Sequence, residues 1–137
     1  HFYFKQDILN QTQMMVDLYG FEVNPIPFNR TYGRDANLNN IHDNGIHDYM
    51  KYVKFGYGRV TDHACRDIRN GVITRSEGIE LVRQYDHVVP GDITRWLDYA
   101  GINRQEFEQI ADTFRDSRVW VQNEYGNWIK DNIWDHN

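Results

Sequence analysis

The chain has 137 residues, about the length of one domain, and folding should bury roughly two thirds of the surface that the unfolded chain exposes. It carries 20 acidic and 15 basic residues, and the net charge of −5 argues against a nucleic-acid binder or a protein attracted to anionic membranes. A single cysteine excludes an internal disulfide, and no apolar segment is long enough for a membrane span, so we expect a cytoplasmic protein.

Hydrophobic residues recur with a helical period along nearly the whole chain, which predicts an all-α fold, a compact domain of several helices. The first helix is expected over about residues 6–19 and should end at Gly20. The polar stretch that follows contains two prolines, which predicts an irregular loop. We divide the chain into an N-terminal helix and loop, residues 1–44, and a helical part, residues 45–137, which together form one structural unit.

The helical part contains start and stop signals for five helices. Glycines predict helix ends, and Ser, Thr, Asp or Asn before an apolar run predicts a helix start. The signals are Gly56 after the second helix, Thr61 at the start of the third, a Thr74-x-x-Glu77 capping box, Asp92 before the fifth helix, Gly101 after it, and an Asn103-x-x-Glu106 box.

The C-terminal tail after residue 118 is rich in large aromatic side chains: Trp120, Tyr125, Trp128 and Trp134. Leaving so much apolar surface in water is costly. We expect these rings either to complete the core of this domain or to dock on another domain.

The segment Lys54-Phe-Gly-Tyr-Gly-Arg59 is the strongest functional signal. Its two glycines let the backbone approach a bound group closely, and the flanking cations favour an anionic ligand such as a diphosphate. From Lys51 to Gln84 there are seven basic and four acidic residues, so this region carries a local positive charge. A helix-to-helix turn with solvated cations is the alternative. The candidate groups are Lys51, Lys54 and Arg59 with the N–H groups of Gly56 and Gly58.

The predicted third helix carries charged residues at three- and four-residue steps, so they share one face: Arg59, Asp62, Arg66 and Arg69. Two interpretations remain open, a ligand-facing row of arginines or a solvated face on which Asp62 pairs with Arg66. On the neighbouring face, His63 and Asp67 are interpreted as a surface pair rather than a catalytic dyad.

Two further groups are weighed as reactive sites. His42-Asp43 and His47-Asp48 contain metal-ligand residue types, but adjacent helical residues point about 100° apart, so we predict no metal site. Cys65 is expected to be a buried, inert thiol. No catalytic residue can be named.

The order of these pieces resembles the C-terminal part of bacterial N-acetyl sugar amidotransferases, which serve lipopolysaccharide or related surface-glycan synthesis, including that of O-antigen. About fifty residues match in order. The matching motifs are Leu38 to Asp43, His47-x-Tyr49, Lys54-Phe-Gly-x-Gly-Arg59, Ile68-Arg-Asn-Gly-x-Ile-Thr-Arg75, Glu77-Gly-x-x-Leu-Val82 and Tyr85-Asp86.

The resemblance implies an enzyme that converts an acetamido to an acetamidino group on a nucleotide-linked sugar, using ATP and ammonia from a partner glutaminase subunit. The family's ATP site is a PP-loop, S-G-G-x-D-S, on an N-terminal domain, and this chain contains no such run. We therefore expect a C-terminal piece without a cofactor of its own, with ATP and Mg on the absent domain. The substrate-binding residues implied are His47, Tyr49, Lys51, Lys54, Gly56, Gly58, Arg59 and Arg66.

Two other function classes stay open. One is a non-catalytic helical module that docks the glutaminase through the aromatic tail and the acidic residues after Asp86. The other is a helix-turn-helix nucleic-acid binder, which the capped helix junctions permit and the acidic charge disfavours.

Overall fold

The computed structural model describes residues 3, 7–35 and 43–135. Within these residues it contains six helices and one short hairpin, so the all-α prediction is confirmed. The elements are α1 (Ile8–Tyr19), α2 (Asn44–Phe55), α3 (Arg59–Arg69), α4 (Arg75–Tyr85), α5 (Ile93–Ala100), α6 (Arg104–Asp112), β1 (Trp120–Gln122) and β2 (Trp128–Lys130).

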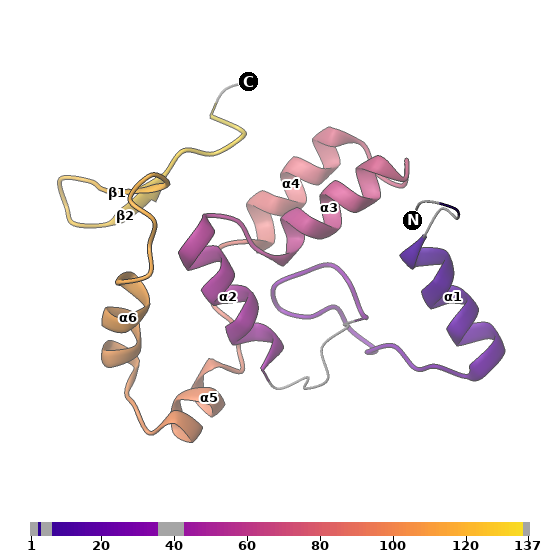
Figure 1. Cartoon of the computed structure of the whole chain (residues 1–137), viewed down its shortest axis with the longest axis horizontal. Coiled ribbons are helices and arrows are strands. Elements are labelled where there is room, and N and C mark those ends of the chain that lie inside the picture. The colour runs from indigo at the N-terminus through magenta and orange to yellow at the C-terminus, as the bar shows by residue number, and fades with distance from the viewer. Residues whose placement is uncertain (1–2, 4–6, 36–42, 136–137) are drawn as a thin grey trace.

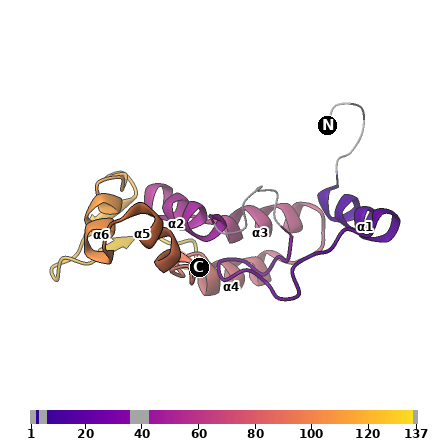
Figure 2. The same ribbon diagram turned by 90° about the horizontal axis from the view of Figure 1, so that it is seen from below.

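The helices form a row rather than a sphere. Figure 1 shows α3 and α4 side by side as an antiparallel pair, with α2 leading into α3 and with α5 and α6 on the other side of α2. Seen from below, α1 lies at one end of the row and α6 with the hairpin lies at the other (Figure 2). The short connection of residues 70–74 explains the antiparallel pair, because it leaves α4 no other way to bury its apolar side.

The main core forms where α2, α5 and α6 meet. Each of these helices contributes apolar residues from one stripe, which removes those side chains from water. Its members are Ile46, Val53, Ile93, Leu97, Phe107 and Ala111, with Tyr49, Met50, Trp96 and Ile102 packed around them.

Most helix boundaries follow the sequence signals. Thr74 with Glu77 and Asn103 with Glu106 both form complete capping boxes, as predicted. The glycines predicted to end three helices, Gly20, Gly56 and Gly101, all have positive φ and cap the preceding helix.

One predicted N-cap, Thr61, is wrong, and another, Asp92, is right in position but makes no cap bond. Helix α3 begins at Arg59 rather than at Thr61, because the side chain that bonds its first N–H groups is Asp86, from a distant part of the chain. Asp92 precedes α5, but its side chain makes no cap bond there and instead accepts from the N–H of Gly45.

Part of the aromatic tail completes the core. Strands β1 and β2 pair antiparallel, and their three-residue length is too short to produce a visible alternation in the sequence. Trp120 is buried against Tyr52 at 5.4 Å between ring centroids, and Arg115 lies over Trp120 and Trp128. Tyr125, at the tip of the hairpin, is 79% exposed.

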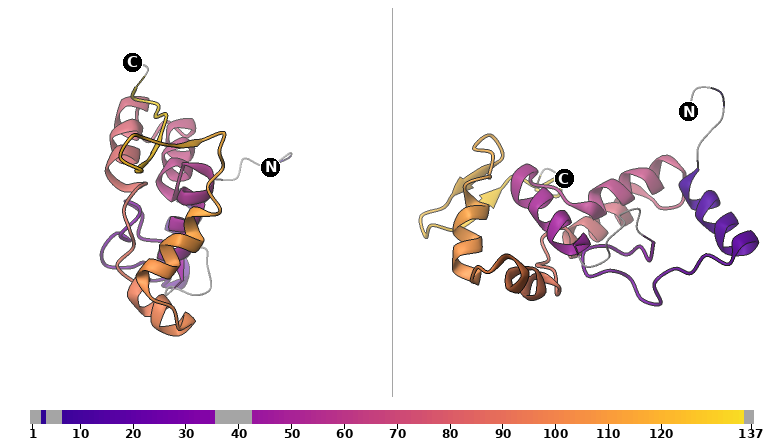
Figure 3. Two further views of the ribbon diagram at one scale, coloured as in Figure 1. Left: turned by 90° about the vertical axis from the view of Figure 1, so that its left-hand side faces the viewer. Right: turned by 60° about the horizontal axis from the view of Figure 1, so that its bottom comes forward.

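Helix α1 stands apart from the other helices, as the right-hand view of Figure 3 shows. None of its residues is buried, and Leu18 is 68% exposed. Among the described residues, no helix combines the length and the hydropathy that a bilayer span requires.

Candidate ligand-binding site

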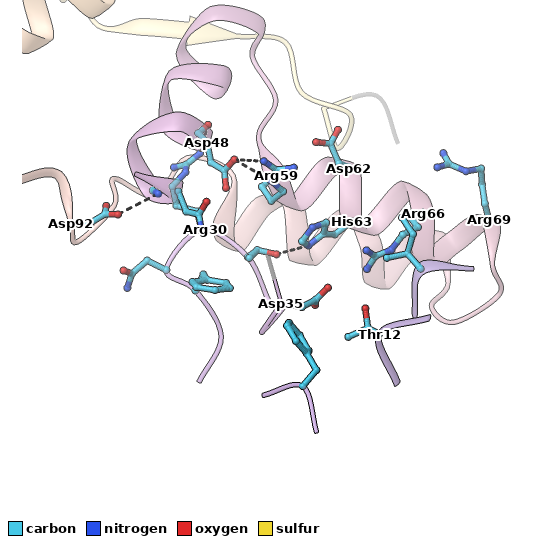
Figure 4. Close-up of a pocket in the computed structure, with 17 residues that line it drawn as sticks. Thr12, Arg30, Asp35, Asp48, Arg59, Asp62, His63, Arg66, Arg69 and Asp92 are labelled. Atoms are coloured by element: carbon cyan, nitrogen blue, oxygen red, sulfur yellow. Dashed lines mark hydrogen bonds and ion pairs between the residues drawn. The ribbon is translucent and has the colours of Figure 1, made fainter. Parts of the chain in front are cut away.

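A pocket of about 430 Å³ opens beside α3 and is shown in Figure 4. Its walls come from α1, the segment 28–35, the start of α2, one face of α3 and Asp92. The walls carry equal numbers of positive and negative side chains, four arginines and four aspartates, besides His63. They are Arg30, Arg59, Arg66, Arg69, Asp35, Asp48, Asp62 and Asp92.

Arg30 fastens the loop wall of this pocket to the helices. It is only 2% exposed, and its guanidinium donates to the backbone carbonyls of Val88, Asp48 and Asp86. Its Cζ also lies 5.4 Å from the centre of the Tyr49 ring. Burial lowers the pKa of Arg30, and the nearby Asp48 and Asp86 oppose that shift. Because three carbonyls accept from it, Arg30 positions the loop rather than a ligand.

Arg59 is held in place by a buried carboxylate. The Oδ1 atom of Asp48 lies 3.0 Å from Arg59 Nε and 2.9 Å from Nη2, in the two-contact geometry that fixes a guanidinium. His47 Nδ1 lies 3.2 Å from the same oxygen, on the solvent side. Arg59 therefore reaches the pocket with little conformational freedom.

Arg66 is anchored in a similar way. Asp67 is buried, and its Oδ1 lies 2.7 Å from Arg66 Nε, while its Oδ2 accepts a hydrogen bond of 2.6 Å from the Tyr32 hydroxyl. Burial and the adjacent Asp67 carboxylate raise the pKa of Tyr32. This bond also joins the loop to α3, so one carboxylate orients an arginine and closes the pocket wall.

His63 lies between these two arginines on the pocket wall. Its Nδ1 is 2.8 Å from the Thr31 hydroxyl, and its ring meets Tyr32 edge-on. Burial, with the positive charges of Arg66 and Arg59, lowers the pKa of His63. The imidazole is therefore neutral near pH 7 and does not add a third cation to the arginine row.

The predicted glycine turn is occupied by the protein's own carboxylate. Asp86 is buried and accepts from the N–H groups of Gly58 at 2.8 Å, Val60 at 3.1 Å and Thr61 at 3.3 Å, and from the Thr61 hydroxyl at 2.6 Å. A Cβ on residue 58 would lie 2.8 Å from Asp86, so only glycine fits there. This turn binds an anion, but that anion is part of the fold.

A family model described as "LPS biosynthesis protein WbpG-like, C-terminal domain" matches residues 26–134. The chain belongs to this family. The match covers the pocket walls from the loop through α3 and Asp92, and it leaves out α1. Membership places the chain among lipopolysaccharide biosynthesis proteins. No curated protein matches the chain.

In this WbpG-like domain, two of the eight predicted substrate-binding residues, Arg59 and Arg66, line the pocket. The N–H of Gly58 donates to Asp86 and that of Gly56 donates to Tyr52, so neither is available to a diphosphate. Gly56 has a φ of 74°, and a Cβ there would meet Val119 at 2.6 Å, which gives it a structural role.

The other four predicted residues lie outside the pocket walls. The His47 side chain is 55% exposed beside Asp48, and Tyr49 packs in the core against Phe107. Lys51 pairs with Asp62 and lies over the Tyr57 ring, and Lys54 lies over the rings of Phe55 and Phe114. Contact of these four residues with substrate stays a prediction.

Two pairings and one burial expected on α3 are corrected. Asp62 pairs with Lys51 rather than with Arg66, because Arg66 turns to the buried Asp67. His63 and Asp67 are no surface pair, since each bonds to the loop instead, through Thr31 and Tyr32. Cys65 is exposed rather than buried, because Ala64 faces the interior in its place.

No group of three potential metal-ligating side chains occurs in the part of the chain that the structure describes. His42 and most of the matched segment 38–43 lie outside the described residues.

The sequence reasoning missed the residues at the end of the pocket near α2. Asn44 is 7% exposed, and both its Oδ1 and its Nδ2 are buried without a hydrogen-bond partner in the described part of the chain. The Oδ1 of Asp92 and the Nε of Arg30 are also buried without a partner. The division after residue 44 separates Asn44 from the helical part of the chain, but α2 begins at Asn44. No local pattern identifies these residues, because Gly45 meets Pro90 and Asp92, which are 45 and 47 positions away along the chain.

Proposed function

We propose that this chain is the C-terminal domain of an ATP-dependent N-acetyl sugar amidotransferase of O-antigen synthesis, and that its pocket binds the nucleotide-linked sugar substrate. Membership of the WbpG-like family supports the role in lipopolysaccharide biosynthesis. The motif resemblance in residues 47–86 supports the reaction, the conversion of an acetamido to an acetamidino group.

The observation that carries this proposal is the arginine row of α3, which lines the pocket with two members already oriented by buried aspartates. A diphosphate is bound best by guanidinium groups whose geometry is fixed before binding. Arg69 lines the same pocket and makes no ion pair among the described residues, so its charge is available to a ligand.

The reaction divides between two parts of the enzyme. ATP, with Mg, on the N-terminal PP-loop domain would activate the acetamido oxygen, and ammonia from the partner glutaminase would displace the activated group. This cytoplasmic domain would hold the substrate against that centre through its pocket. We assign no catalytic residue to the chain.

A binding titration tests the proposal, with UDP-N-acetylglucosamine as the probe and isothermal calorimetry as the readout. We expect the Arg69→Gln variant to bind about tenfold more weakly, which is the loss of one charge-assisted contact. Arg104→Gln is the matched control, because Arg104 pairs with Glu108 on α6, outside the pocket. Absence of binding to the wild-type chain, or equal losses in both variants, would contradict the proposal.

A second candidate function is docking of the glutaminase subunit, and one observation favours it. Helix α1 exposes apolar side chains, among them Met14, Leu18 and Tyr19, that the other helices do not cover. Deleting the tail is a poor test because it removes the buried Trp120. The Leu18→Glu variant is better: loss of glutaminase capture at unchanged melting temperature would support docking, and unchanged capture would exclude α1.

A further inference from the structure

The two ends of the pocket offer different chemistry. Figure 4 shows Asp92 at one end and Arg69 at the other, with Arg59, His63 and Arg66 along α3 between them. The α3 end can attract phosphate. The opposite end, at the first turn of α2, already holds the carboxylate of Asp92 against the Gly45 N–H, with the buried Asp48 on the same wall. The guanidinium groups of Arg30 and Arg59 balance these two carboxylates, so this end has no excess positive charge to attract a phosphate and suits an uncharged group.

Three polar atoms of Asn44 and Asp92 at this end of the pocket have no hydrogen-bond partner among the residues that the structure describes. Asn44 presents a donor, Nδ2, and an acceptor, Oδ1, and Asp92 presents a second acceptor, Oδ1. Such atoms are usually satisfied in folded proteins, because a buried donor or acceptor without a partner has lost its hydrogen bonds to water. Here they belong to side chains that line a pocket, and Asn44 is more than nine-tenths buried. A group that binds at this end would replace those hydrogen bonds.

We infer that Asn44 and Asp92 form the subsite that recognises the acetamido group of the substrate. The inference rests on the proposed function and adds the orientation of the ligand, with the diphosphate toward Arg66 and Arg69. The N–H and the carbonyl of a trans secondary amide point in opposite directions, so two side chains are needed to satisfy both. Asn44 Nδ2 donates to the carbonyl, and Asp92 Oδ1 accepts from the N–H. The Asn44 amide can turn toward the pocket without breaking a hydrogen bond, since it makes none.

The subsite also explains why α2 contains a glycine in its first turn. A Cβ on residue 45 would lie 2.1 Å from Asp92 Oδ1, so any other residue would displace the carboxylate. Gly45 thus allows Asp92 to approach the helix backbone at the residue that follows Asn44 in the chain, and both side chains line the pocket. Phe28 lines the same pocket and offers an apolar surface to the sugar.

Three probes separate this inference from the proposed function: UDP-N-acetylglucosamine, UDP-glucose and UDP. The two sugar nucleotides differ in the acetamido group alone. We expect the wild-type chain to bind the acetamido probe about tenfold more tightly than UDP-glucose. Asn44→Leu keeps the size of the side chain and removes its polar atoms, and it should abolish this preference. Arg69→Gln should weaken all three probes alike and leave the preference intact.

Asn127→Leu is the control, because Asn127 is exposed in the hairpin turn and does not line the pocket. Equal wild-type affinity for both sugar nucleotides would overturn the subsite while leaving the proposed function standing. A preference that survives Asn44→Leu would overturn the role of Asn44. If none of the three probes binds the wild-type chain, the proposed function fails, and the subsite fails with it.

Discussion

Asp86 and Asp92 occupy similar positions in the fold, but their carboxylates differ in how many hydrogen bonds they accept. Each reaches from the segment after α4 to the first turn of an earlier helix, Asp86 to α3 and Asp92 to α2. Asp86 accepts four hydrogen bonds, of which the shortest is 2.6 Å, and both of its oxygens are used. Among the described residues, Asp92 accepts one hydrogen bond, at 3.3 Å from the Gly45 N–H, and its second oxygen is buried without a partner.

The difference teaches how to tell a structural carboxylate from a binding one. At the α3 turn every polar group is satisfied inside the protein, so a ligand would have to displace Asp86 and would gain little. At the start of α2 the polar groups of Asn44 and Asp92 remain unsatisfied. Because such a cost is rarely left uncompensated in a folded protein, the α2 end is the better place for recognition.

The largest expected effect comes from removing the two carboxylates. Asp86→Ala leaves the α3 N–H groups and Thr61 without their acceptor, and the free energy of unfolding should fall by about 3 kcal/mol. Asp92→Ala removes one long bond and one unsatisfied oxygen, so it should cost less than about 1 kcal/mol. Urea denaturation of both variants measures the two losses in the free energy of unfolding. Equal losses would contradict the distinction between Asp86 and Asp92.

A second pair of variants should change the free energy of unfolding in opposite directions. Thr61→Val removes the hydroxyl that donates to Asp86 and should lower the free energy of unfolding by about 1 kcal/mol. Asn44→Leu replaces unsatisfied buried polar atoms by apolar ones of similar size and should raise it by about 1 kcal/mol. Thermal denaturation tests both. A clear destabilisation by Asn44→Leu would mean that its amide has a structural partner.

The smallest expected effect is a pH dependence of stability that comes from His63. This residue lies on the pocket wall and not at the α3 turn, so the effect reports on the pocket alone. The pKa of His63 is lowered in the folded protein, so the unfolded state binds the proton more readily. Stability from this group is therefore complete above the unfolded pKa of about 6.5 and is lost as pH falls below it. His63→Asn should show a weaker loss between pH 7 and 5. An NMR titration in which His63 has a pKa above 6.5 would contradict this.

Sequence reasoning predicted the fold class and most helix ends, because caps and glycine stops act within four residues. Thr74 with Glu77 and Asn103 with Glu106 are such cases. It also identified Arg59 and Arg66, since helical spacing alone puts them on one face. The predictions failed where the partner lies outside this window of about four residues, as for the cap of α3 and the pairing of Asp62.

The sequence by itself determined that the chain is helical, where its capping boxes form, and that a row of arginines shares one face of a helix. Only the tertiary structure decided what that face meets. Arg30 joins carbonyls 56 and 58 positions away, and Asp86 occupies the glycine turn from 28 positions away. Such contacts depend on how the helices pack, and packing is a property of the whole chain rather than of any window of residues. For that reason the turn that looked ready for a ligand is filled, while Asn44, which the sequence did not mark as a binding residue, lines the pocket without a side-chain hydrogen bond to any described residue.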